Sequence, residues 1–144
     1  MSIESKQNEI VEEFSMLDGD MEMTINYIME LGEEMPALDE AYKTEDYIVK
    51  GCQSKVWLKA ESEENLVVFQ GDSNTAITKG LISLLIRVLS HESPEDILNA
   101  ELDFPQRIGM SRFIGTQRSN GFAAMIKQMK LYALALSSKT KTGA

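Results

Sequence analysis

The sequence predicts a single α+β domain in which a small antiparallel β-sheet is flanked by helices. Two runs of alternating polarity lie near the middle, and segments with apolar residues at helical spacing lie on either side. No internal repeat or linker divides the 144 residues, a length that fits one ordinary domain. We therefore expect one domain over residues 1–144, with a core from about residue 3 to 136 and a frayed tail at 137–144.

The N-terminal part predicts two helices. The first carries Ile10 and Phe14 on one face, and the polar triplet "DGD", which ends at Asp20, interrupts it. Asp20 has the side chain of a helix N-cap, so a second helix is expected from there to about Leu31. Gly32 is its expected stop, because glycine readily adopts the left-handed conformation that ends helices.

The middle of the chain predicts a loop followed by a β-hairpin. Residues 33–51 are acidic, include a proline and have no sustained period, so we expect a loop with one short helical turn. Residues 56–60 alternate in polarity and predict a strand. The polar "ESEEN" favours a turn, and "LVVFQ" at residues 66–70 predicts the returning strand.

Two further helices are expected after the hairpin. Asp72 or Ser73 is the expected N-cap of a strongly amphipathic helix over residues 77–89. The "SPED" that begins at Ser93 resembles a capping box, in which the serine caps a short helix that runs to about Asn99.

The C-terminal part predicts a long loop and a last helix. Residues 100–121 contain several glycines and a proline, and we interpret them as mostly loop. The helix that follows would bury one apolar face. That face consists of Phe122, Ile126, Met129, Ala133 and Leu136.

The composition narrows the classes of partner. The formal net charge of −9 repels phosphate backbones and anionic lipids, so we expect no nucleic acid and no membrane as partner. A protein with a basic face fits this charge. No apolar run reaches the length of a membrane span, and the N-terminus has no signal-peptide pattern. One cysteine allows no internal disulfide, and we expect a cytoplasmic protein.

The single cysteine, Cys52, lies in "YIVKGCQSKVWLKA", where the chain turns into a strand. A lone cysteine is most often a small buried apolar residue. Three features instead favour a reactive thiol at this position. They are the turn itself, the backbone freedom of Gly51, and the positive charge of Lys50 and Lys55, which would favour the thiolate.

One reactive thiol permits several chemistries. A hydrolase would pair Cys52 with a base, and the one histidine, His91, follows the end of a predicted helix, where a solvated role is ordinary. A disulfide oxidoreductase needs a second thiol, whereas accepting sulfur from a partner's persulfide needs only one.

Arg87 and Arg118 could bind carboxylates or be solvated. The acidic residues at 33–46 lack metal-ligand spacing, so no metal site is expected.

Four segments, in order along the chain, resemble the SufE-like sulfur acceptors that partner cysteine desulfurases in iron–sulfur cluster assembly. They are "ELGEEMPAL" at 30–38, "GCQSKVW" at 51–57, "GDSNTAITKGL" at 71–81 and "QRSNGFAAMIKQMK" at 117–130. The resemblance covers about residues 10–136 and implies an α+β fold shared with the IscU-type cluster scaffolds. A scaffold itself would need several cysteines to hold iron, and this chain has one.

The resemblance also implies roles for particular residues. Cys52 would receive persulfide sulfur from the desulfurase, stimulate that enzyme and relay the sulfur for cluster assembly. Three neighbours would shape the loop that presents it: Gly51, Gln53 and Ser54. Asp72 and Arg118 would support the loop or contact the partner.

Partners and cofactors follow from the same resemblance. The expected partner is a SufS-like cysteine desulfurase, which itself holds pyridoxal phosphate, so no cofactor is expected in this chain. A cluster scaffold is the expected recipient of the sulfur. The chain would then be a sulfur carrier and activator rather than an enzyme. A cysteine-dependent hydrolase that uses Cys52, and a thiol-independent adaptor of the desulfurase, are the alternatives.

Overall fold

A computed structural model of the chain describes the backbone of residues 2–143 and the side chains of residues 2–137. It confirms the α+β architecture, with one two-stranded antiparallel sheet and helices around it. The elements, in chain order, are α1 (Ile3–Ser15), α2 (Met21–Glu34), the 3-10 helices η1 (Glu40–Tyr42) and η2 (Glu45–Tyr47), β1 (Val56–Glu63), β2 (Leu66–Ser73), α3 (Ala76–Leu89), α4 (Pro94–Asn99), α5 (Phe104–Arg107) and α6 (Met110–Gly143).

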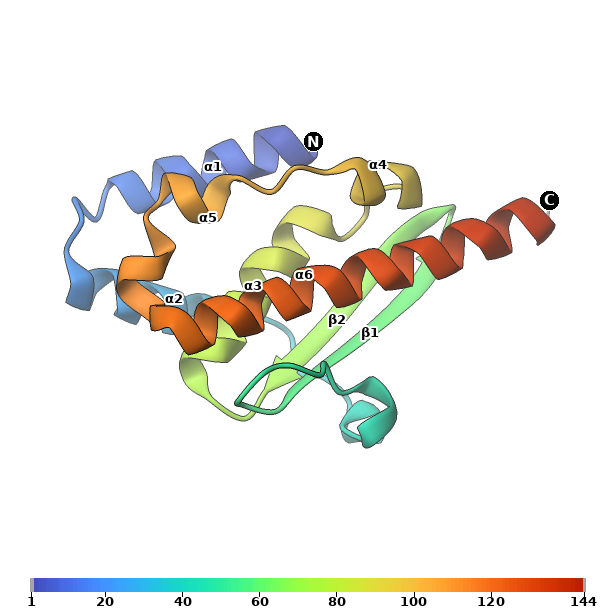
Figure 1. The fold of residues 1–144 in the computed structure, drawn as a ribbon, viewed down its shortest axis with the longest axis horizontal. Coiled ribbons are helices and arrows are strands. Elements are labelled where there is room, and N and C mark those ends of the chain that lie inside the picture. Colours follow the sequence, from blue (N-terminus) through green and yellow to red (C-terminus); the bar gives the residue numbers. More distant parts are fainter. Residues whose placement is uncertain (1, 144) are drawn as a thin grey trace.

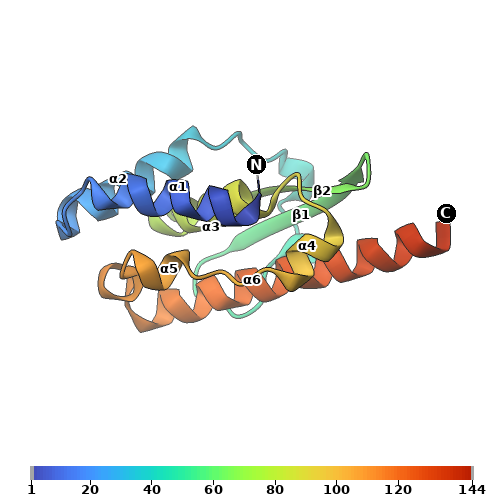
Figure 2. The ribbon, with the colours of Figure 1, turned by 90° about the horizontal axis from the view of Figure 1, so that it is seen from above.

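The helices cover the hairpin from two sides. Figure 1 shows α6 crossing in front of the hairpin and following the direction of its strands. Figure 2 shows α6 on one side of the hairpin and α1 and α2 on the other. Helix α3 packs on both β2 and α2, so the apolar core lies between α3, the inner face of the hairpin and α6.

The hairpin is longer than the sequence pattern predicts. Glu61 to Glu63 continue β1 and pair with the first residues of β2, so only Glu64 and Asn65 make the turn. Both turn residues have positive φ, 53° and 67°, which matches the twist of a tight two-residue hairpin. The added β1 side chains, Glu61 to Glu63, are exposed to solvent. Polar side chains are compatible with a strand there, and their polarity alone suggested a turn.

The contact between α2 and α3 corrects the expected end of the second helix. Asp20 caps α2 as predicted, accepting a hydrogen bond from the Met23 N–H at 2.9 Å. The helix then continues through Gly32 to Glu34. A Cβ atom on Gly32 would lie 2.7 Å from the backbone nitrogen of Gly80 on α3. Gly32 is therefore needed for close helix packing and does not stop the helix.

Arg87 forms an ion pair between two helices of its own chain. Its guanidinium on α3 forms two hydrogen bonds to the carboxylate of Glu13 on α1. The Tyr27 hydroxyl on α2 donates to the same carboxylate. The hydrogen bond from Arg87 is the main reason that the pKa of Glu13 is lowered, whereas burial and Glu13 raise the pKa of Tyr27 to about 12. Arg87 thus binds a carboxylate of its own chain and joins three helices.

Of the two helix N-caps predicted after the hairpin, the one for α4 is confirmed and the one for α3 is wrong. Ser93 caps α4 as expected, accepting from the Asp96 N–H at 3.1 Å, and α4 ends at Asn99. Neither Asp72 nor Ser73 caps α3, because both belong to β2. Thr75 occupies the N-cap position of α3 and makes no side-chain cap hydrogen bond. The strand therefore runs three residues further than its apolar pattern indicates.

The expectation of a long loop over residues 100–121 is wrong for most of its length. Helix α5 begins at Phe104, whose fully buried ring packs edge-on against Phe122 at a centroid separation of 6.0 Å. Helix α6 begins at Met110 and is interrupted at Gly115, where φ is 79° and ψ is 173°. The glycines that suggested a loop mark this break and the start of α6.

The predicted apolar face of the last helix is confirmed. It is buried at Phe122, Met129 and Ala133 and half-buried at Ile126 and Leu136. The backbone of α6 remains helical through Gly143, so most of the expected tail at 137–144 is helical; Ala144 lies outside the described residues, and fraying stays a prediction. No helix in the described part of the chain is long and apolar enough to cross a membrane.

Candidate functional site

Cys52 lies on a short loop that its own backbone closes at the base. The Val49 N–H donates to the Val56 carbonyl at 2.8 Å, and Ile48 bridges to Trp57 on β1. Residues 50–55, which we call the thiol loop, project beyond this closure. Gly51 forms the turn just before the cysteine with φ at 97°, a conformation that L side chains rarely adopt.

The second half of the thiol loop is held by the segment between β2 and α3. The Ser54 hydroxyl accepts hydrogen bonds from the hydroxyls of Thr75 at 3.0 Å and Thr78 at 3.4 Å. The Lys55 carbonyl accepts from the Ser73 hydroxyl at 2.8 Å. The Lys55 N–H donates to the Asn74 side chain at 3.0 Å. The loop is therefore fixed at its base and along one arm, while its tip meets α6.

The sulfur of Cys52 is half-buried against α6. Its thiol donates to the Gly121 carbonyl with a sulfur–oxygen distance of 3.4 Å, and a Cβ on Gly121 would lie 3.4 Å from the sulfur. Burial raises the pKa of the Cys52 thiol. The expectation that Lys50 and Lys55 favour the thiolate is wrong for this state, because both lysines are exposed and burial determines the direction of the shift.

The thiol opens onto a pocket of about 340 Å³ formed between the thiol loop, α3 and α6. Four of the predicted site residues line it: Cys52, Gln53, Ser54 and Arg118. Sequence reasoning did not single out the other lining residues, which include Thr78, Leu81, Gly115, Gly121 and Met125. Gly121 and Thr78 lie inside the segments "QRSNGFAAMIKQMK" and "GDSNTAITKGL", which resemble the family. That resemblance is the one sequence signal that could have indicated them.

Arg118 reaches the pocket from the first full turn of α6 after the break. Its guanidinium donates to the Ile114 carbonyl at 3.4 Å, across the non-helical Gly115. That carbonyl belongs to the segment before the break, where the regular helical ladder is interrupted. Arg118 thus sits at the rim of the thiol pocket with its remaining donors directed to no carboxylate of the described residues.

Asp72 lies outside the pocket. It is a residue of β2 and pairs with Trp57 on β1. Its buried carboxylate accepts from the Ser73 N–H at 2.8 Å and pairs with Lys43 at 3.2 Å and Lys79 at 3.5 Å. Burial opposes ionisation of Asp72, but these three partners prevail and its pKa is lowered. Asp72 therefore joins the segment after η1 to α3 and is not among the pocket-lining residues.

His91 and Cys52 lie at opposite ends of α3. The thiol pocket touches the N-terminal part of this helix at Thr78, while His91 lies two residues beyond its last residue, Leu89. From Thr78 to Leu89 the helix rises through eleven residue steps, which is about 16 Å. This separation argues against the cysteine–histidine hydrolase. Among the described residues, no group of three or more histidine, cysteine, aspartate and glutamate side chains is arranged to hold a metal ion.

The fold and the site define an α+β domain that presents one half-buried thiol on a loop beside a pocket. The sequence matches the model of the SufE family, described as an Fe-S metabolism associated domain, over residues 8–133. The chain therefore belongs to the SufE family.

Two curated relatives are similar to most of the chain. An uncharacterized SufE-like protein of Rhizobium meliloti is 31% identical over 128 residues, which cover 85% of this chain and 91% of the relative. A SufE-like protein of Arabidopsis thaliana, described as chloroplastic/mitochondrial, is 37% identical over 113 residues. That match covers 78% of this chain but 30% of the longer plant protein.

A solved structure has the same fold. The solution structure of a hypothetical protein from Thermus thermophilus superposes with a TM-score of 0.76, covering 92% of this chain and 96% of the other. The sequence identity is 21%, so this likeness concerns the fold alone.

Proposed function

We propose that Cys52 accepts a sulfur atom from the persulfide of a partner cysteine desulfurase and relays it for iron–sulfur cluster assembly. Membership of the SufE family supports a role in Fe–S metabolism. The observation that carries the finer proposal is the position of Cys52, the only thiol of the chain, on a loop closed at its base and open to a pocket.

The proposed step is an exchange between two sulfur centres. The Cys52 sulfur attacks the outer sulfur of the partner's persulfide, and a new S–S bond forms as the partner's S–S bond breaks. The partner's cysteine leaves as a thiolate and takes the proton that Cys52 loses. Cys52 becomes a persulfide, and no external oxidant or reductant is required.

The resting geometry favours the protonated thiol, so docking must change the surroundings of Cys52. Burial raises the pKa of Cys52, and the thiol donates to a carbonyl that would repel a thiolate. Displacing the loop tip from Gly121 removes both effects. The backbone freedom of Gly51 makes such a movement possible while the closure between Val49 and Val56 persists.

The supporting residues would act through the loop and the rim of the pocket. Ser54 would hold the outgoing arm through Thr75 and Thr78, and Gln53 would form the edge beside the thiol. Arg118 would contact the partner or keep the break in α6 in place. Asp72 would act at a distance from the thiol, by fixing Lys43 and Lys79.

The partner is proposed to be a pyridoxal-phosphate-dependent cysteine desulfurase, which this chain stimulates by removing its persulfide. A cluster scaffold is the proposed recipient, and this chain acts as a carrier rather than as an enzyme. A cytoplasmic location stays a prediction.

Intact-mass measurement after incubation with the cognate desulfurase and L-cysteine tests the proposal. Cys52 should gain one sulfur, about 32 Da, through the exchange. Cys52→Ser should gain none. Moving the thiol to exposed Ser15 on α1, as Cys52→Ser with Ser15→Cys, should not restore the gain, because Ser15 lies outside both the thiol loop and the residues that line the pocket. Sulfur added to Cys52→Ser would refute the relay.

Measurement of alanine release by the desulfurase separates the relay from the adaptor alternative. Cys52→Ala should abolish the stimulation while the two proteins still bind, because it removes only the acceptor atom. Full stimulation by Cys52→Ala would mean that the protein acts as a thiol-independent adaptor.

A further inference from the structure

The charges of this acidic chain are unevenly distributed along the sequence. Residues 104–144 contain seven lysines and arginines and no aspartate or glutamate. The other 103 residues hold the remaining seven basic residues and all 23 acidic ones, so their formal charge is 7 − 23 = −16. The net charge of −9 therefore hides a cationic C-terminal segment, most of which is α6.

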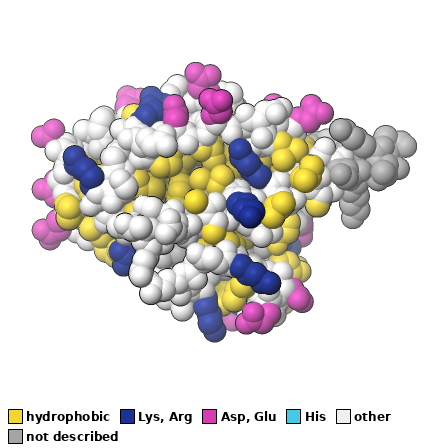
Figure 3. All heavy atoms as spheres, viewed as in Figure 1, with side chains coloured by type: hydrophobic (Ala, Val, Ile, Leu, Met, Phe, Trp, Pro, Cys, Tyr) yellow, Lys and Arg dark blue, Asp and Glu magenta, His cyan; other side chains and the backbone are white. Residues whose placement is uncertain are grey.

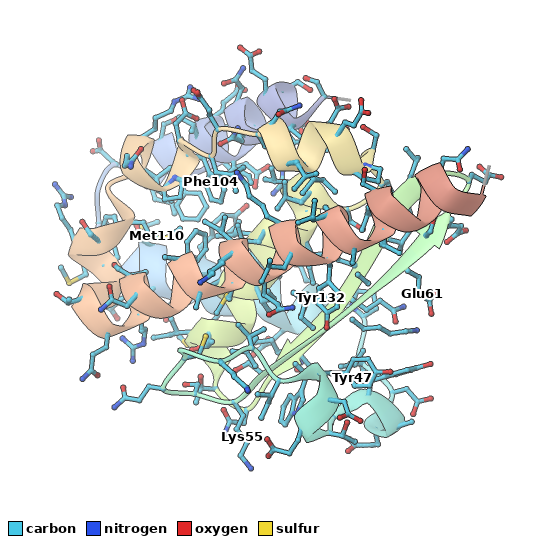
Figure 4. The ribbon with its side chains drawn as sticks, turned by 45° about the vertical axis from the view of Figure 1, so that its right-hand side comes forward. Tyr47, Lys55, Glu61, Phe104, Met110 and Tyr132 are labelled. Carbon is cyan, nitrogen blue, oxygen red and sulfur yellow. The ribbon has the colours of Figure 1, made fainter. Side chains whose placement is uncertain are left out.

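The fold places this cationic helix against the thiol loop, which is also basic. Ala124 and Gly121 of α6 contact the loop at Gly51 and Cys52. The loop carries Lys50 and Lys55, both exposed. Figure 3 shows lysine and arginine side chains across the middle of the α6 face, while most acidic side chains lie toward its outline. Figure 4 shows Lys55 extending outward from the molecule.

The pairing of the cations also separates this face from the rest of the surface. Away from the thiol loop and α6, each described lysine and arginine forms an ion pair with a carboxylate: Lys6, Lys43, Lys59, Lys79, Arg87 and Arg107. On the thiol loop and on α6 beyond its break at Gly115, four exposed cations have no such pair among the described residues: Lys50, Lys55, Arg118 and Lys127. We call these four the basic face.

We propose that the basic face docks on an acidic surface of the protein that exchanges sulfur with Cys52. The inference rests on the proposed function and specifies the partner: the surface around its donor sulfur carries aspartate and glutamate. The net charge of the whole chain, by contrast, is compatible with a partner that has a basic face.

Screening by salt explains why the charge near the thiol, rather than the net charge of the chain, determines which surface can dock there. The Debye length is about 8 Å at physiological ionic strength, so at contact a partner responds to charges around the thiol more than to acidic residues on the far side. The acidic remainder of the surface would repel the same acidic partner in wrong orientations. The two signs together would orient the encounter so that the thiol leads.

The first experiment measures the field at Cys52 without any partner. The thiol is reacted with two methanethiosulfonates, one bearing a sulfonate and one a trimethylammonium group. In Lys50→Gln/Lys55→Gln, the ratio of anionic to cationic rates should fall about threefold at low salt. A net-charge-matched control, Asn8→Asp/Asn99→Asp, alters exposed side chains outside the basic face and should leave the ratio unchanged. Equal ratios in all three proteins would show that Lys50 and Lys55 do not set the field at Cys52, and this would overturn the proposal.

The second experiment measures association with the cognate desulfurase by stopped flow. The double lysine variant should associate about fivefold more slowly at low ionic strength, the control at the parental rate, and the difference should shrink as salt is added. Faster association of the lysine variant would mean that the partner's surface is basic, and equal slowing of both variants would mean that only net charge matters. Either result overturns the proposal.

Sulfur loading of the parent protein distinguishes failure of the sulfur relay from failure of the acidic docking surface. If the parent gains no sulfur and does not bind the desulfurase, the proposed function fails, and the docking proposal fails with it. If the parent gains sulfur on Cys52 but the lysine variant associates at the parental rate, the relay stands and the acidic docking surface is refuted.

Discussion

The Cys52 sulfur lies 3.4 Å from the carbonyl oxygen of Gly121, so the thiol itself joins the tip of its loop to α6. The hydrogen bond requires the proton, because a thiolate has nothing to donate and would face the carbonyl oxygen directly. Two residues 69 positions apart in the sequence thus set the resting state of the sulfur.

The reactivity of Cys52 should therefore depend on pH with a midpoint above that of an ordinary cysteine, about 8.5. Burial penalises the thiolate and raises the folded-state pKa of Cys52. The preference for the thiol stabilises the fold below the unfolded pKa, and this contribution is lost as the pH rises through the folded pKa. Alkylation rates with neutral iodoacetamide across pH 7–10 measure the midpoint, with urea-unfolded protein as the reference. A folded midpoint at or below the unfolded one would contradict the buried resting state.

Gly51→Ala should destabilise the protein and expose the thiol. The substitution places a side chain at φ 97° and brings its Cβ to 3.2 Å from the Cβ of Ala124. We expect a loss of about 1–3 kcal/mol in the free energy of unfolding and faster alkylation of Cys52, because the loop tip is pushed off α6. Gly109→Ala is the control, since Gly109 has φ 67° but lies outside the thiol pocket. It should lower stability and leave alkylation unchanged; parallel changes in alkylation would show that the effect is global.

Glu13→Gln should weaken the junction of α1, α2 and α3. It replaces a carboxylate whose pKa is lowered mainly by its hydrogen bond with Arg87. The loss at pH 7 should be about 1–2 kcal/mol. A lowered pKa stabilises the fold above the unfolded value and not below the folded one, so the difference from the parent should shrink as the pH falls below about 4. Exposed Glu12 on the same helix provides the control, and Glu12→Gln should cost little in urea unfolding. A Glu13→Gln deficit independent of pH would exclude the ion pair as its cause.

Gly32→Ala should be destabilising although alanine is the better helix former. Its Cβ would lie 2.7 Å from the Gly80 nitrogen, so α2 must move away from α3. The expected loss is about 1–3 kcal/mol. Gly121→Ala is the matched change, because its Cβ meets only ordinary contacts, the nearest at 3.4 Å, and helix propensity should stabilise it by up to about 1 kcal/mol. Equal stabilisation of both variants would show that the helices adjust without cost.

The elements that could be predicted from the sequence are those whose patterns are set locally. The helix that buries Ile10 and Phe14 and the apolar face of the last helix follow from spacing alone. Gly32 resembles a helix stop because it lies near the end of an apolar pattern, while its actual role depends on the backbone of a helix about 50 residues away. Residues 104–121 resemble a loop in the sequence because glycines at breaks between helices have the same signature as loop glycines.

The candidate site could be predicted in part for the same reason. The thiol loop is a continuous segment, so Cys52 and its neighbours could be identified from one motif. The opposite wall of the pocket comes from α3 and α6, and no local pattern indicates that Gly121 faces the sulfur. The charge of Lys50 and Lys55 was visible, but the burial of the thiol, which determines the direction of its pKa shift, was not.

The half-burial of the only thiol also affects how the protein tolerates oxidation. Two copies could be joined covalently only if their sulfur atoms approached to about 2.05 Å, and each sulfur is half-buried against α6 of its own chain. A purified preparation should therefore stay free of covalent dimers in air for longer than its unfolded form. Because no second cysteine exists in the chain, a sulfur atom held at Cys52 has no internal thiol to release it. Its lifetime depends on which outside molecules can enter the pocket.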